Sequence, residues 1–138
     1  MMQENSKVER TGDGWSYCID LTPMPEYVLV RVEGAMDEAA GEQYRVDLTE
    51  AYRYMVTHGS SRAPIIADYR EFETSSWSIP RFTRVHGSVY SADHRLIVIA
   101  YDHEGEPPLM VTMLLQYARS LFRNVSIVYS MEEALALV

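Results

Sequence analysis

Cysteine is scarce in this 138-residue chain, and long apolar runs and excess positive charge are missing; each of these features excludes a class of protein. The single cysteine, Cys18, cannot form an internal disulfide, and the polar first ten residues lack a secretory-signal pattern, so we expect a cytoplasmic protein. No apolar run reaches the roughly 18 residues that a membrane-spanning helix needs, so we expect no membrane insertion. The net charge of −8 argues against a nucleic-acid partner.

Motifs for catalysis and for cofactors are also missing. The seven glycines are scattered and form no phosphate-binding loop, and no G-x-S-x-G nucleophile motif occurs. His58, His86, His94 and His103 are separated by 28, 8 and 9 residues, so no pair has the i, i+4 spacing of a helical zinc site. Cys18 falls in a strand pattern, where cysteine is usually a small core residue. We therefore expect no enzyme, no metal and no cofactor.

Apolar residues make up 47% of the chain, which is enough for a packed core, and their spacing predicts the elements around it. Residues 15–21 and 26–33 alternate apolar with polar side chains, which predicts an antiparallel hairpin. Residues 37–58 carry apolar side chains at helical spacing between a candidate N-cap, Asp37, and a candidate stop, Gly59.

Two uninterrupted apolar segments, 63–68 and 95–101, predict buried strands of a sheet that is covered on both faces. Further expected elements are helices over about 80–90 and 108–122, a strand over 125–129 and a helix over 131–138, which opens with the capping box Ser130-Met-Glu-Glu133. The chain therefore predicts an α/β fold with a mainly parallel five-stranded sheet, an N-terminal antiparallel hairpin and about four helices. We expect residues 1–14 to be a flexible N-terminal arm and residues 15–138 to form a single domain.

This order of elements resembles the STAS, or SpoIIAA-like, family, whose fold is shared with CRAL-TRIO lipid-binding domains. The local similarities are Val32-Glu-Gly34 before an acidic helix start, the apolar strand that ends in Asp68, and the closing segment 125–138. The resemblance covers residues 26–138. It implies a SpoIIAA-like layered fold and a non-enzymatic regulatory or protein-interaction module. The alternative that it implies is a protein that binds a small apolar, lipid-like ligand.

The resemblance also implies a candidate phosphorylation switch. Family members carry Asp-Ser-Ser-Gly at the start of the helix after the third strand, and a kinase phosphorylates the first serine. The matching segment here is Glu73-Thr-Ser-Ser-Trp77, which lacks the glycine and has the acid displaced. Ser75 and Ser76 are the switch candidates because a phosphate at a helix N-terminus meets free backbone N–H groups. The alternative is that they are only loop and capping residues.

Polar residues at the carboxyl ends of the apolar strands are candidates for a ligand crevice. Asp68 and Asp102 each follow such a strand, and His103 is next to Asp102. Parallel α/β sheets bind ligands at this edge, and paired carboxylates can transfer protons or hold a metal. The alternative is that the aspartates cap turns or helices.

The helix expected over 108–122 has more apolar residues than one buried face needs. Met110, Leu114, Tyr117 and Leu121 form one face, which leaves Leu109, Val111, Met113 and Leu115 on other faces. These residues can belong to a deeper core, to a homodimer or protein-partner interface, or to an apolar-ligand cleft. Because exposed apolar side chains favour aggregation, we expect a homodimer or an equivalent partner site there.

Overall fold

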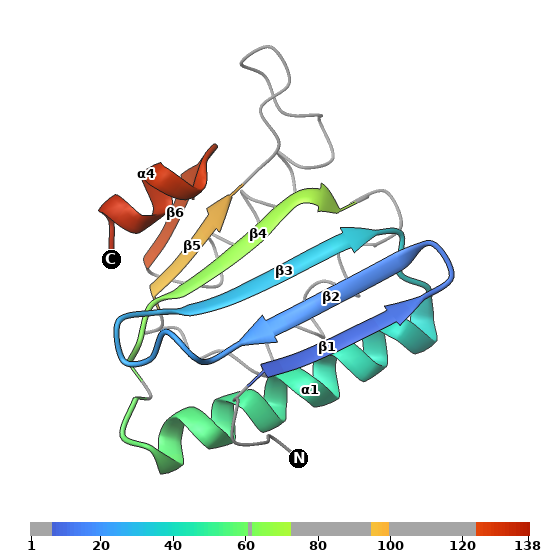
Figure 1. Cartoon of the computed structure of the whole chain (residues 1–138), viewed down its shortest axis with the longest axis horizontal. Helices are drawn as coiled ribbons and strands as arrows, with labels where there is room; N and C mark the ends of the chain where they lie inside the picture. The colour runs from blue at the N-terminus through green and yellow to red at the C-terminus, as the bar shows by residue number, and fades with distance from the viewer. Residues whose placement is uncertain (1–6, 61, 73–94, 100–123) are drawn as a thin grey trace.

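The computed structural model describes residues 7–60, 62–72, 95–99 and 124–138 and shows an α/β protein (Figure 1). Its elements are β1 (Lys7–Gly12), β2 (Trp15–Asp20), β3 (Val28–Gly34), α1 (Glu38–Thr57), β4 (Ile65–Phe72), β5 (Arg95–Ile99), β6 (Asn124–Val128) and α4 (Met131–Ala136). The six strands form one sheet in chain order, β1 to β6. The pairs β1–β2 and β2–β3 are antiparallel, and the remaining pairs are parallel. The predicted α/β class and the antiparallel hairpin are thus confirmed.

The N-terminal segment differs from the expected flexible arm. Residues 7–12 form β1, which pairs with β2 along its whole length, so the described part of the sheet already has six strands where five were expected. The turn at Gly14, with φ +78°, folds β1 back onto β2. The strand carries a single large apolar residue, Val8, so it has neither the alternating pattern nor the uninterrupted apolar segment from which other strands are predicted.

Strand β4 also extends further than its sequence predicts. Residues 69–72, which follow the segment predicted as a strand over 63–68, continue the strand to Phe72. The pairing with β3 shifts by one residue there, so that Tyr69 and Arg70 both lie opposite Val32. This bulge interrupts the two-residue alternation from which strands are predicted. The helices expected over about 80–90 and 108–122 lie outside the described residues.

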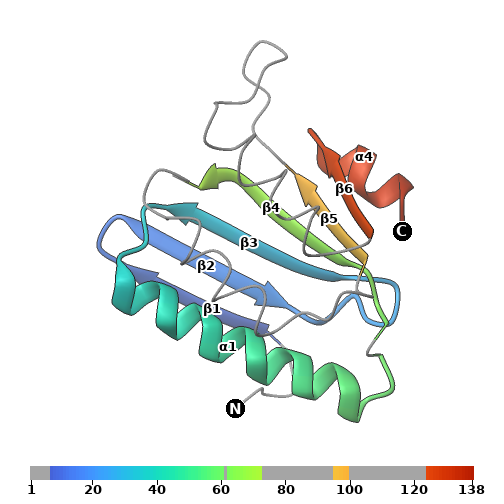
Figure 2. The ribbon, with the colours of Figure 1, turned by 180° about the vertical axis from the view of Figure 1, so that it is seen from behind.

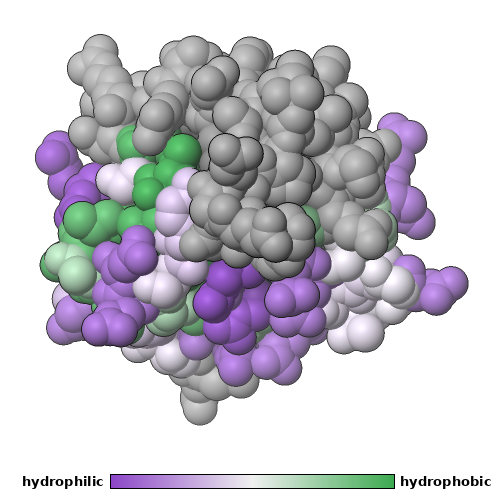
Figure 3. Space-filling model, turned by 90° about the horizontal axis from the view of Figure 1, so that it is seen from above, coloured by the Kyte–Doolittle hydropathy of each residue, from purple (hydrophilic) through white to green (hydrophobic). Residues whose placement is uncertain are grey.

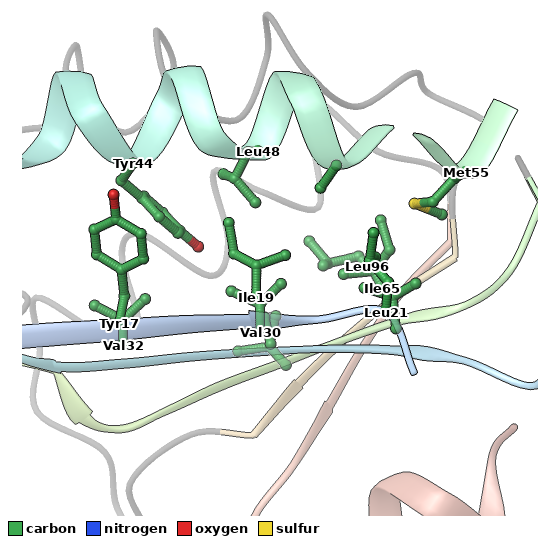
Figure 4. Packing of buried hydrophobic residues seen from close by; sticks show 14 of the residues in the cluster. Tyr17, Ile19, Leu21, Val30, Val32, Tyr44, Leu48, Met55, Ile65 and Leu96 are labelled. Atoms are coloured by element: carbon green, nitrogen blue, oxygen red, sulfur yellow. The ribbon is translucent and has the colours of Figure 1, made fainter. Parts of the chain in front are cut away.

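The main core lies between α1 and one face of the sheet (Figure 4). Tyr44, Leu48 and Met55 point from α1 toward the sheet, and each is at most 3% exposed. Leu48 lies over Ile19, and Met55 lies over Ile65. The space left between this part of α1 and the sheet is about 10 Å³, so the interface is filled by side chains.

Both ends of α1 follow the predicted capping. Asp37 is the N-cap, and its side chain accepts a hydrogen bond from the Ala40 N–H at 2.8 Å. The helix ends at Thr57, and Gly59 follows with φ +72°, which fits the predicted stop. The predicted helix boundaries at both ends are therefore confirmed to within one residue.

Helix α4 lies on the face of the sheet opposite α1 (Figures 1 and 2). It contacts β5 and β6, so it covers only one end of this face. Ala134 of α4 is fully buried in a second cluster with Ile66, Ile97 and Ile99. Ser130 caps α4 by accepting from the Glu133 N–H at 3.1 Å, as the sequence predicts. No helix in the described part of the chain packs over β1, β2 and β3 on this face, and the side chains there are mostly polar.

Candidate functional site

The sheet face opposite α1 carries charged and polar side chains over β1 to β4, which we call the polar half-face. Its members are Lys7, Glu9, Thr11, Ser16, Cys18, Asp20, Arg31, Glu33, Asp68, Arg70 and Glu71. Strand pairing arranges them in rows, because residues opposite one another in the register project to the same face. One row runs from Cys18 through Arg31 to Asp68, and another from Ser16 through Glu33 to Glu71.

A buried carboxylate with two arginines lies at the centre of the polar half-face. The Arg70 guanidinium donates from Nε to Oδ1 of Asp68 at 2.9 Å and from Nη2 to Oδ2 at 2.8 Å, and the Arg70 backbone N–H donates to Oδ1 at 3.2 Å. Arg31 donates from Nε to Oδ2 at 3.3 Å. The Asp68 side chain is 5% exposed, whereas those of Arg31 and Arg70 are 45% and 37% exposed. One buried anion therefore orients two solvent-accessible cations.

The charge on Asp68 is stabilised by its partners. Burial by itself would raise the pKa of Asp68, but the hydrogen bonds from Arg70 and Arg31 outweigh it and hold the pKa below its ordinary value. The carboxylate is thus ionised at neutral pH, and general-base or general-acid work there would compete with its two ion pairs. Asp68 fits a role in positioning the arginines better than a role in proton transfer.

An open groove of about 570 Å³ lies at the carboxyl ends of β3 and β4, next to this cluster. It is lined by Thr11, Gly14, Trp15, Ser16, Glu33, Gly34 and Glu71. Glu33 and Glu71 are both exposed and lie opposite each other in the parallel register. Through these two glutamates, the groove adds negative charge beside the two arginines. In the view from above, hydrophilic residues lie in the middle of the described surface and hydrophobic residues lie to their left (Figure 3).

The thiol of Cys18 lies in the same row as Arg31 but is not activated. Burial raises its pKa, with Lys7 and Arg31 only partly opposing the shift. A thiol with a raised pKa is a poor nucleophile at neutral pH. Cys18 is half-buried on the polar half-face and belongs to neither hydrophobic cluster, so the expected core position was wrong.

Of the candidate site residues predicted from the sequence, Asp68 alone lies in the described part of the chain. Asp68 lies within β4, four residues before the end of the strand, and is paired with Arg31 and Arg70 rather than open at the strand end. The expectation that Asp68 stands just past the end of its strand was wrong, because β4 continues beyond the bulge to Phe72. The other candidates, Asp102, His103, Ser75, Ser76, Leu109, Val111, Met113 and Leu115, lie outside the described residues.

Sequence reasoning missed Arg31 and Arg70 as site residues. Arg31 lies 37 residues before Asp68, so only the β3–β4 register brings the two together. A weak signal was present, because Arg31 follows Tyr27 and Leu29 at two-residue spacing and is a charged residue on that face of the expected strand. Arg70 had no such signal, since the bulge that places its side chain beside Asp68 has no pattern of its own.

Comparison with known proteins adds no family to these observations. The chain matches no model of a protein family, and no curated protein is similar to it at a significant level. Among the described residues, no three His, Cys, Asp or Glu side chains gather as metal ligands. None of the helices in that part of the chain is both long and apolar enough to cross a membrane.

Proposed function

We propose that this protein is a non-enzymatic protein-interaction module of the STAS type, with the polar half-face as its contact surface. The observation that carries the proposal is the pair of half-exposed arginines that buried Asp68 holds in place. Arginine is enriched at protein interfaces, and an arginine that is already oriented loses less side-chain entropy when a partner binds.

The charges around the arginines define the kind of partner. Glu33 and Glu71 carry negative charge beside Arg31 and Arg70, so the surface presents both signs within one patch. A partner with acidic side chains for the arginines and basic side chains for the glutamates complements this pattern. A folded protein surface meets that requirement better than a ligand with one sign of charge.

Two further parts of the proposal depend on the sequence alone: the resemblance implies the first, and the surplus of apolar residues on the helix expected over 108–122 implies the second. Phosphorylation of Ser75 or Ser76 would control such a partner, and Leu109, Val111, Met113 and Leu115 would form a homodimer or partner interface. These residues lie outside the described parts of the chain, so both statements stay predictions. The apolar-ligand alternative is the second prediction of the resemblance, and the 10 Å³ between α1 and the sheet gives it no site in that interface.

Quantitative capture from an extract of the native host tests the proposal. The wild-type chain, Arg31→Gln and Arg53→Gln are immobilised at equal density, and bound proteins are measured by mass spectrometry. Arg53 is exposed on α1, at a distance from the polar half-face, so it is a control for the loss of one positive charge. Arg31→Gln leaves the two hydrogen bonds from the Arg70 guanidinium to Asp68 in place, so the fold is retained.

The expected result is a protein that wild type and Arg53→Gln capture equally and that Arg31→Gln captures at least fivefold less. Isothermal titration with that purified protein should give the same order of affinities. If every captured protein binds Arg31→Gln as well as wild type, the polar half-face is not the contact surface.

A further inference from the structure

Strand β1 is attached to the rest of the protein by few interactions. It pairs with β2 alone and forms the edge of the sheet among the described strands. Lys7, Glu9, Arg10 and Thr11 are exposed, and Val8 is only partly buried against the core. A strand with so little buried apolar surface belongs to the least stable part of a fold.

One side-chain cluster connects β1 to α1. Arg10 donates from Nε to Oδ2 of Asp47 at 2.8 Å and from Nη2 to Oδ1 at 3.1 Å. Asp47 lies on the buried face of α1 and is 3% exposed. The Tyr17 hydroxyl of β2 donates to Oδ2 at 2.6 Å, and the Gln43 amide donates to Oδ1 at 3.1 Å. The carboxylate is therefore fully hydrogen-bonded while β1 is in place.

Arg10 is the only cation within ion-pair distance of Asp47 in the described part of the chain. If β1 leaves, Tyr17 and Gln43 can still donate to the carboxylate, but its counter-charge is gone. A buried carboxylate without a cation is strongly unfavourable. The attachment of β1 thus depends on one ion pair more than on apolar contacts.

We propose that β1 is a releasable strand and that the Arg10–Asp47 ion pair is the latch that holds it. Release moves residues 7–12 away from β2 while α1, β2, β3 and β4 keep their packing. The backbone N–H and C=O groups of β2 that pair with β1 then lose their partners. The device is a local opening that one side-chain contact controls.

Hydrogen exchange of the full chain, followed by mass spectrometry with fragmentation to resolve single strands, tests this inference. In wild type, we expect β1 amides to exchange at least tenfold faster than β3 and β4 amides after correction for intrinsic rates. Arg10→Gln should accelerate β1 at least a further tenfold. The control Glu9→Gln, on the same strand but without a contact to α1, should change β1 exchange less than twofold.

A second variant separates local release from global unfolding. Leu48→Ala weakens the α1–sheet core, which stays packed when only β1 opens, so it should accelerate β3 and β4 amides and leave β1 exchange unchanged. If β1 and β3 amides exchange equally fast in wild type, β1 does not open separately and the inference is overturned. Equal acceleration of β1 and β3 by Leu48→Ala would overturn it as well.

Discussion

Gly34, the last residue of β3, occupies a position where no side chain fits. Its φ is +78°, which favours glycine, and a Cβ there would lie 2.1 Å from the carbonyl oxygen of Gly14. That oxygen accepts a hydrogen bond from the Ala35 N–H at 3.0 Å. The contact joins the β1–β2 turn to the end of β3 and shapes one wall of the groove beside the polar half-face.

Replacing Gly34 should therefore destabilise the fold much more than replacing a glycine that has a positive φ but open space around its Cβ position. Gly34→Ala should lower the free energy of unfolding by about 2–4 kcal/mol, because the new methyl group displaces backbone as well as straining φ. Gly59→Ala is the matched control, with φ +72° and no atom within 4 Å of its Cβ position, and should cost about 1 kcal/mol. Urea denaturation measures both, and equal losses would contradict the steric explanation.

At the scale of elements, the sequence predicts those parts of the fold whose signals are local. Helix α1 has its cap, its apolar spacing and its stop within 23 residues, and all three are confirmed. Strand β1 and the end of β4 were missed, because one is held by pairing with β2 and an ion pair to α1, and the other passes through a bulge. The Asp68 cluster was found only in part for the same reason, since the register brings Arg31 to it from 37 residues away.

The packing of α1 on the sheet contributes to the free energy of unfolding, and substitutions on the helix can measure this contribution. Leu48→Ala should lower the free energy of unfolding by about 2–4 kcal/mol, because Leu48 is 3% exposed and its loss leaves a cavity against β2 and β3. Val46→Ala, on the same helix but 40% exposed, should change it by less than about 0.5 kcal/mol. If the two variants unfold at the same urea concentration, the orientation of α1 on the sheet is wrong.

At the scale of the whole molecule, buried ionisable groups set the pH range of stability. Burial would raise the pKa of Asp47, but hydrogen bonds from Arg10 and Tyr17 outweigh it and lower the pKa, as the arginines do for Asp68. Desolvation raises the pKa of Tyr17 well above its usual range and that of Tyr69 to about 12. The folded protein thus favours ionised aspartates and neutral tyrosines.

Stability should therefore decline at both ends of the pH scale. The contribution of the two aspartates is complete above their ordinary pKa of about 3.9 and is lost as the pH falls through the lowered folded-state values. The contribution of Tyr17 and Tyr69 is complete below about pH 10 and is lost as the pH rises toward their raised values. Denaturation midpoints between pH 2 and pH 11 measure both limbs.

A double variant tests whether Asp47 and Asp68 cause the loss of stability at low pH, the acid limb of the pH profile. Asp47→Asn with Asp68→Asn should be less stable than wild type at neutral pH but should lose less on acidification, because its two amides do not titrate. Should the acid limb of this variant be as steep as that of wild type, other carboxylates govern acid stability. If the double variant does not fold, Asp47→Asn and Asp68→Asn are measured separately at pH 3 and pH 7. Each single variant should then lose less stability between pH 7 and pH 3 than wild type does.

The strictly sequential strand order has a consequence for how the chain reaches this fold during synthesis. Each described strand pairs with the described strand before it in the chain, so none of these six has to be inserted between two that are already paired. The meander of β1, β2 and β3 closes through short loops, which keeps the entropy cost of the first contacts low. The sheet can therefore grow strand by strand in the direction of translation, and the half that bears the two oriented arginines can assemble while the ribosome is still producing the remainder.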